Sequence, residues 1–176
     1  ADETLSRLVG DGYDAALEPA IWGEVLGRVR QFVGGFAAAL FAKDATKNRG
    51  GVYFDDGEID PHFRELYFAR YIELDPTTSG QYFAEIGEPI STADLLPYEE
   101  FVETRFYKEW ARPQGCVDFV GAVLDKTATS VAMFGVFRHE RDGLADDGTR
   151  YRMRLIVPHI RRAALIGRVL DLKSAE

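Results

Sequence analysis

The spacing of apolar residues in the first third of the chain predicts helices followed by a β-hairpin. A broad apolar stripe with a period of 3.6 residues predicts a core-packing helix over residues 21–33, and Gly34-Gly35 ends it. A weaker stripe of the same kind predicts a helix over residues 3–16. Residues 36–42 form a short apolar run typical of a strand buried on both faces, and residues 52–54 predict its return strand.

Polar residues that favour helix starts divide the middle of the chain. Asp60-Pro61 combines an N-cap residue with proline at the first helical position, and it predicts a helix that ends before Asp75-Pro76. Residues 91–94 resemble a capping box. Pro97 then begins a further predicted helix, with apolar residues at four-residue steps as far as Trp110.

The clearest strands and the longest helix fall in the last third of the chain. Residues 117–124 and 131–138 are apolar on both faces and are joined by polar turn residues, which predicts a central antiparallel pair. Residues 147–173 predict one long helix with a kink at Pro158, where an interior hydrogen bond is lost.

Together these elements predict an α+β domain, with helices packed on an antiparallel sheet of about four to five strands and a long C-terminal helix. The order of the elements is similar to that of the GAF and PAS sensory folds. We expect residues 1–164 to form this domain, and residues 165–176 to continue the long helix toward a downstream domain. Leu165, Val169 and Leu172 form an apolar seam on that helix, which predicts a homodimer through a partner helix.

The composition agrees with a single domain. The 176 residues have a mass of 19.7 kDa and are 46% hydrophobic, enough for a sizeable core. The longest stretches without charged residues, 31–42 and 127–137, have 12 and 11 residues, whereas a bilayer crossing takes about 20. No secretory signal opens the chain, and its single cysteine cannot form an internal disulfide. We therefore expect a cytoplasmic protein with no membrane partner.

The formal net charge of −8 is unevenly distributed. Residues 148–176 carry seven basic side chains against two acidic ones, so the rest of the chain is strongly acidic. A basic last helix on an acidic body suits nucleic acid, or else the acidic surface of its own domain or of a second copy.

Residues that commonly carry catalysis or bind metals form no recognisable pattern. The three histidines lie on different elements and lack the spacing of metal ligands. The glycines fit neither a dinucleotide loop nor a phosphate loop. Cys116 with a histidine would suit a small hydrolase or transferase, but its apolar surroundings are typical of a buried core thiol. We expect neither an enzyme nor a metal or other cofactor.

Aromatic residues are concentrated in the middle of the chain, between Tyr53 and Trp110. Rings with polar tips suit a pocket for a mostly apolar small molecule, although such stripes also fill ordinary cores. Gly121 and Gly135 interrupt the two clearest strands, where glycine often leaves room close to the backbone. Asp118 interrupts the first of these strands as well.

Three motifs stand in the second half of the chain: Phe-Val-Glu-Thr-Arg-Phe-Tyr-Lys-Glu-Trp-Ala-Arg-Pro-Gln-Gly (101–115), Phe-Gly-Val-Phe-Arg-His-Glu-Arg (134–141) and Val-Pro-His-Ile-Arg-Arg-Ala (157–163). Upstream of them lie Tyr67, Tyr71 and Asp75-Pro76. This combination resembles the N-terminal sensory region of bacterial LuxR-type helix-turn-helix regulators. The resemblance implies a signal-receiving domain that contacts DNA only through a downstream domain absent from this sequence.

The resemblance also implies a role for Asp75. This residue matches the Asp-Pro acid that, in acyl-homoserine-lactone receptors, accepts a hydrogen bond from the ligand amide. Tyr67 and Tyr71 loosely match nearby pocket aromatics of those receptors. Phe63 stands where they carry a tryptophan and lacks its indole donor, so an acyl-homoserine lactone is not the predicted ligand.

We interpret the chain as a ligand-sensing regulatory domain of a transcriptional regulator. An unknown small molecule would bind between Asp75, as polar anchor, and aromatic walls formed by Tyr53, Phe63, Tyr67, Tyr71 and Trp110. Binding would shift the packing of the last helix and so reach the downstream domain. The alternative is a ligand-free dimerisation module of the same kind of regulator, with a filled core.

Overall fold

The computed structural model describes residues 2–170 and 172 and has the predicted α+β architecture, built on a five-stranded antiparallel sheet. The strand order is β2-β1-β5-β4-β3, so the two clearest predicted strands are neighbours near the centre. The strands are β1 (Ala37–Asp44), β2 (Arg49–Asp55), β3 (Ile90–Ser91), β4 (Cys116–Lys126) and β5 (Ser130–His139).

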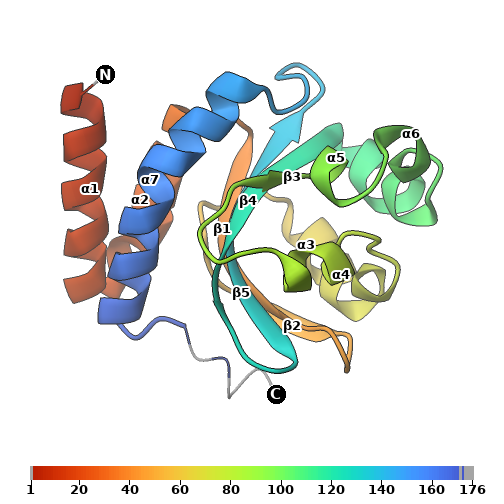
Figure 1. Ribbon diagram of the computed structural model, residues 1–176, viewed down its shortest axis with the longest axis horizontal. Helices are drawn as coiled ribbons and strands as arrows, with labels where there is room; N and C mark the ends of the chain where they lie inside the picture. Colours follow the sequence, from red (N-terminus) through yellow and green to blue (C-terminus); the bar gives the residue numbers. More distant parts are fainter. Residues whose placement is uncertain (1, 171, 173–176) are drawn as a thin grey trace.

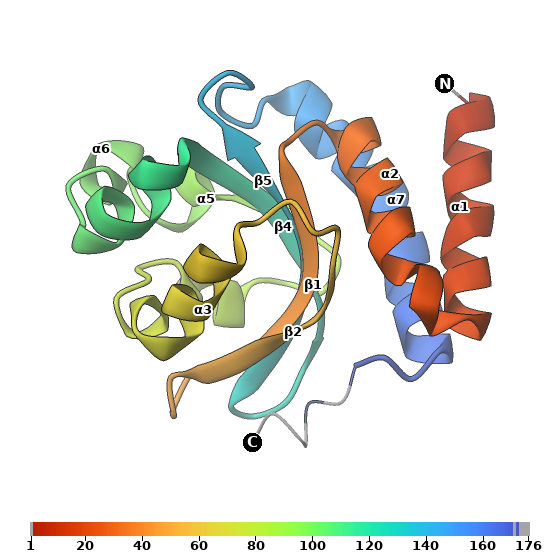
Figure 2. The same ribbon diagram turned by 180° about the vertical axis from the view of Figure 1, so that it is seen from behind.

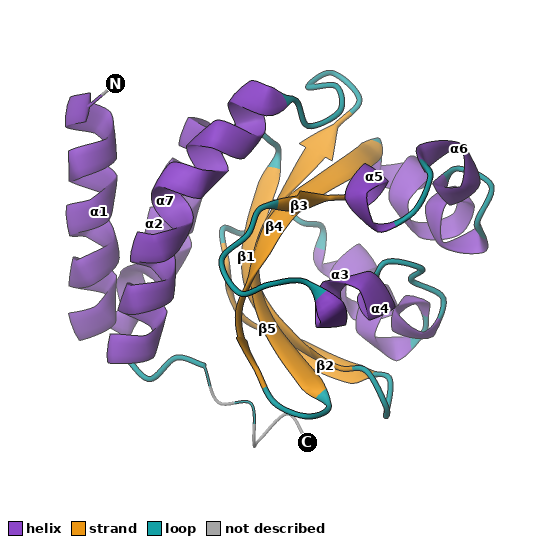
Figure 3. Ribbon diagram, viewed as in Figure 1, coloured by secondary structure: helices purple, strands orange, loops and turns teal. Residues whose placement is uncertain are grey.

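The helices form two unlike layers on the two faces of the sheet (Figures 1 and 2). The long helices α1 (Asp2–Leu17), α2 (Trp22–Val33) and α7 (Asp147–Ile166) lie on one face, with α1 outermost. The other face carries only short helices (Figure 3). These are α3 (Pro61–Ala69), α4 (Thr78–Phe83), α5 (Thr92–Leu95) and α6 (Tyr98–Phe101).

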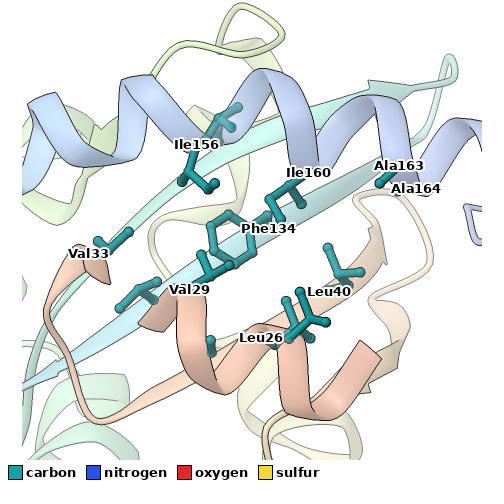
Figure 4. Close-up of a cluster of buried hydrophobic side chains, with 14 of the residues drawn as sticks. Leu26, Val29, Val33, Leu40, Phe134, Ile156, Ile160, Ala163 and Ala164 are labelled. Atoms are coloured by element: carbon teal, nitrogen blue, oxygen red, sulfur yellow. The ribbon is translucent and has the colours of Figure 1, made fainter. Parts of the chain in front are cut away.

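The main hydrophobic core lies between the sheet and the long helices. Because successive strand residues point to opposite faces, Leu40 of β1 and Phe134 of β5 both face this layer. Figure 4 shows them meeting Leu26 of α2 and Ile160 of α7, all of which are fully buried. The alternate residues of the same strands therefore face the short helices.

The polar signals at helix ends act as predicted. The Asp60 carboxylate accepts a hydrogen bond from the backbone N–H of His62 at 2.9 Å, which caps α3. Ser91 and Asp94 form the predicted capping box of α5. Gly34 ends α2 with a φ of 101°, a conformation that favours glycine.

Two predicted helices are shorter than expected. The helix after Asp60 ends at Ala69, and a 3-10 turn, η2 (Tyr71–Glu73), follows it. The helix predicted from Pro97 divides into α6 and a π-helical turn, η3 (Tyr107–Ala111). Thr104 lies at this break, where its hydroxyl donates to the Phe101 carbonyl and accepts from the Tyr107 N–H. Such local side-chain bonds compete with continuous helix.

The prediction that the last helix continues to residue 173 is wrong. Helix α7 runs on through Pro158 but ends at Ile166, and Arg168 takes a left-handed φ of 54°. The chain then folds back, so that Val169 packs on the main core and Leu172 is buried against Ala42 and Ala132. Burying these side chains within the domain replaces the expected seam. Lys173 and the rest of 173–176 lie outside the described residues.

The room left by the two strand glycines is filled by the chain itself. Gly121 and Gly135 are cross-strand partners on β4 and β5. A Cβ atom at Gly135 would lie within 2.1 Å of the Phe119 ring, and one at Gly121 within 2.5 Å. The Phe119 ring therefore covers the glycine pair on the face that carries the short helices.

We expect Gly135→Ala to lower the free energy of unfolding by about 1–3 kcal/mol, because the added methyl group overlaps the Phe119 ring. Urea unfolding followed by circular dichroism measures the change. Gly10→Ala is the matched control, since nothing lies within 4 Å of a Cβ there, and it should stabilise helix α1 by about 0.5–1 kcal/mol. Equal effects of the two variants would contradict the close contact at Gly135.

Candidate functional site

A cavity of about 80 Å³ lies between the sheet and the short helices. Strand β1 contributes alternate residues to its wall, and α3 contributes Tyr67. Most of the lining side chains are apolar or aromatic. They include Ala39, Phe41, Val52, Ile59, Tyr67, Phe68, Leu95, Phe101, Phe106, Trp110, Ala111, Phe119 and Phe137.

The polar part of the wall centres on Asp75, whose side chain is 5% exposed. Its Oδ2 atom accepts hydrogen bonds from Lys43 Nζ at 3.1 Å and from the Tyr67 hydroxyl at 2.7 Å. Its Oδ1 atom accepts from the backbone N–H of Thr77 at 2.9 Å and from the Thr77 hydroxyl at 2.6 Å. A carboxylate offers about four lone-pair sites, so these four donors saturate Asp75.

Lys43 is as fully hydrogen-bonded as its partner Asp75. Its Nζ atom donates to Asp75, to Gln81 Oε1 at 2.9 Å and to Thr78 Oγ1 at 3.4 Å, which accounts for the three protons of an ammonium group. The same nitrogen lies 5.2 Å from the centre of the Tyr67 ring, within the range of a cation–π contact.

Burial and charge act in opposite directions on the Asp75 pKa. Burial alone raises the pKa of this carboxyl, but the nearby Lys43 ammonium and the bonds from Thr77 and Tyr67 outweigh it, so the pKa lies below its ordinary value. Burial and the Asp75 charge raise the pKa of the Tyr67 phenol well above its ordinary value. Asp75 is therefore ionised and Tyr67 neutral at pH 7.

Packed aromatic rings form the side of the cavity opposite the sheet. The Trp110 ring lies 5.3 Å from that of Tyr67 and 5.2 Å from that of Phe106. The indole N–H of Trp110 donates to the backbone carbonyl of Phe63 at 2.7 Å. Trp110 therefore presents its apolar surface to the cavity, while its one hydrogen-bond donor is engaged within the protein.

The structure brings together some of the predicted site residues. Tyr67, Asp75 and Trp110 line the cavity. Phe63 and Tyr71 belong to the same aromatic cluster but lie behind the cavity wall, and the Tyr71 hydroxyl donates to Glu109 at 3.1 Å. Whether the cavity residues bind a ligand remains a prediction.

Tyr53 lies elsewhere. Phe41 pairs with Val52 and Leu40 pairs with Phe54, so Tyr53 is the extra residue of a β-bulge in β2. Tyr53 packs against the main core on the long-helix side of the sheet. Its expected place in the cavity wall is therefore wrong, although Tyr53 does line a separate groove between β2 and α3.

Sequence reasoning missed Lys43, which follows directly after the strand predicted over residues 36–42. Strand β1 continues to Asp44, and Lys43 shares the cavity face with Ala39 and Phe41. The i, i+2, i+4 spacing of these three residues was the available signal, because it places them on one face of a strand.

Cys116 also lies on the cavity wall and is buried. Burial and the nearby Asp118 charge raise the pKa of its thiol to about 12. The thiol is therefore protonated at neutral pH, whereas a nucleophilic cysteine needs a lowered pKa. The described residues contain no cluster of three side chains suited to binding a metal ion.

Arginines of α7 bind their own domain rather than pointing away from it. Arg150 contacts Asp94 at 2.6 Å and the Ser91 hydroxyl at 2.6 Å, at the start of α5. Arg152 donates to the Val33 carbonyl. These contacts, with those of Arg154 to Glu88 and Arg161 to the Leu124 carbonyl, agree with a basic helix packed on its own domain.

Comparison with known proteins gives structural neighbours only. No family model and no curated protein matches the sequence. The ligand-binding domain of VqsR from Pseudomonas aeruginosa has a TM-score of 0.73 at 16% identity, over 97% of this chain and 98% of that one. The phycoerythrobilin-bound GAF domain from a cyanobacterial phytochrome has a TM-score of 0.52 at 13% identity, over 95% of each chain. The predicted GAF-like fold is confirmed.

Within the described part of the chain, no helix has both the length and the apolar character needed to cross a membrane. This agrees with the absence of long uncharged stretches from the sequence.

We expect the Asp75 carboxylate, which accepts four hydrogen bonds, to make the free energy of unfolding depend on pH. The pKa of Asp75 is lower in the folded protein than its ordinary value of 3.8, so its stabilising contribution is complete above that value. It is lost as the pH falls through the lower, folded value. Asp75→Asn should lower the free energy of unfolding by about 3–5 kcal/mol at pH 7, because Lys43 loses its partner, and by progressively less as the pH falls below 3.8.

Urea unfolding between pH 2 and 7 tests this expectation. Asp60→Asn is the matched control, because it makes the same substitution at an exposed site and keeps an N-cap side chain, and it should lower the free energy of unfolding at pH 7 far less than Asp75→Asn. A constant difference between Asp75→Asn and the wild type at all pH values would contradict the account of Asp75.

Proposed function

We propose that this domain is a small-molecule sensor that binds its ligand in the cavity beside Tyr67 and Trp110. The observation that carries the proposal is an apolar hollow whose polar groups already have partners within the protein. A solidly packed core has few voids larger than a water molecule, whereas this hollow has room for several atoms.

The geometry favours an apolar ligand group of modest size. An engineered cavity of about 150 Å³ admits benzene, and this one has about half that volume. A short branched alkyl group matches it in size and chemistry. An acyl-homoserine lactone matches neither, because its amide would have to displace a donor from Asp75.

The fold and the sequence motifs support a regulatory role. The VqsR neighbour is a ligand-binding domain, and the GAF neighbour holds phycoerythrobilin. With the LuxR-type motifs at residues 101–115, 134–141 and 157–163, these likenesses favour the sensory domain of a bacterial transcriptional regulator. DNA contact would belong to another domain of such a regulator, and catalysis has no part in the proposal.

Contacts between the cavity wall and α7 supply a route for the signal. Thr92 lines the cavity, and its backbone N–H donates to Asp118, another wall residue. Arg150 of α7 binds the preceding residue, Ser91, together with Asp94. A ligand that moves the start of α5 would therefore pull directly on α7.

A ligand-free dimerisation module is the alternative. Exposed apolar side chains at the C-terminal ends of α1 and α7 favour it, namely Leu17 at 84%, Leu165 at 38% and Ile166 at 62% exposure. A homodimer through this end of the helical layer is compatible with sensing as well. Unlike the sensor, the dimerisation module requires no ligand in the cavity.

We expect xenon to enter the cavity, because xenon binds dry apolar cavities in proteins. Under xenon pressure, NMR signals of Ala39, Phe119 and Ala111 should shift and saturate. Ala39→Leu should abolish the shifts by filling the hollow from β1, whereas Ala69→Leu, the same change at an exposed site of α3, should leave them intact. Wild-type signals that do not respond to xenon would contradict the sensor and favour the dimerisation module.

We expect Arg150 to couple the occupied cavity to α7. In the wild type, xenon should shift backbone signals of residues 91–95 and of the first two turns of α7. Arg150→Gln should reduce the α7 shifts by at least about half while keeping those of the cavity wall, because its contacts at Ser91 and Asp94 are lost. Arg154→Gln removes only an exposed ion pair and is the control. Unchanged α7 shifts in Arg150→Gln would exclude this route.

A further inference from the structure

A second hollow adjoins the cavity. A groove of about 640 Å³ lies between β2 and α3, and it shares three wall residues with the cavity, namely Val52, Arg64 and Phe68. The two hollows therefore meet at these side chains. The cavity itself is small and apolar, whereas the groove is open and polar at its wall.

An ion pair lies across the junction between the groove and the cavity. Arg64 Nη1 of α3 lies 2.7 Å from Asp55 Oδ2 of β2, and the two side chains are 43% and 12% exposed. An ion pair at this degree of exposure contributes about 0–1 kcal/mol, so it opens at little cost. Opening it would remove one link between α3 and β2 at the point where both hollows meet.

The charges of the groove favour a particular kind of ligand. Its wall carries the carboxylates of Asp55 and Glu65 and the single guanidinium of Arg64, a formal charge of −1. The whole chain carries −8, which adds to the attraction for a cation. A carboxylate in the groove would face two like charges.

We propose that the groove between β2 and α3 is the entrance of the cavity and binds the ammonium head of an amphipathic amine. The short apolar end of this ligand passes Val52 and Phe68 into the cavity. Its head remains in the groove, where it pairs with Asp55 and Glu65. This inference rests on the proposed function and names the class of ligand for the same site.

Three molecules with one branched tail test the head group: isoamylamine, isoamyl alcohol and 4-methylpentanoate. Titration of the purified domain at low ionic strength, followed by NMR, gives the three dissociation constants. We expect isoamylamine to bind most tightly and 4-methylpentanoate most weakly. Glu65→Gln should weaken isoamylamine about three-fold and leave the alcohol unchanged. Asp55→Asn should act in the same direction, and Asp60→Asn, outside both hollows, should have no effect.

Each other outcome overturns the inference. If 4-methylpentanoate binds as tightly as the amine, the charge assignment is wrong. If Glu65→Gln leaves the affinity for isoamylamine unchanged, the head does not lie in this groove. If none of the three molecules binds while xenon still enters the cavity, the groove between β2 and α3 is not the entrance of the cavity, and the proposed function stands. If xenon is excluded as well, the proposed function fails with it.

Discussion

The buried ion pair between Lys43 and Asp75 is the interaction on which the short-helix face depends. Burial of two charges costs several kcal/mol per ion, and good geometry with further hydrogen bonds is needed to offset that cost. Tyr67, Thr77 and Gln81 belong to the network that supplies those bonds. The pair thereby ties β1 to the segment between η2 and α4, and it holds the two layers in a fixed relation around the cavity.

The helices on the two faces of the sheet differ in how firmly they are held in place. The long helices bury a continuous core against one face, and α7 adds arginine contacts to neighbouring elements. On the other face, α5 and α6 have four residues each, too few for a helix that is stable without tertiary packing. Elements of low local stability commonly carry ligand sites and moving parts. The cavity lies under these elements, and Arg150 joins them to the rigid layer.

Local chemistry allowed much of the fold to be predicted, whereas contacts between distant residues did not follow from it. The caps at Asp60 and Ser91 and the paired strands depend on neighbours in sequence, and they are present as predicted. The position of Tyr53 depends on a bulge that appears only when β2 pairs with β1. The partnership of Lys43 with Asp75 joins residues 32 positions apart. The turn that ends α7 at Ile166 depends on the core that receives Val169.

A crystal structure of the domain under xenon pressure is the most direct test of the cavity. We expect an anomalous peak between the rings of Tyr67, Trp110 and Phe119, with the bonds between Lys43 and Asp75 unchanged. A structure with no peak there, in which these rings have closed onto the sheet and fill the space, would contradict it.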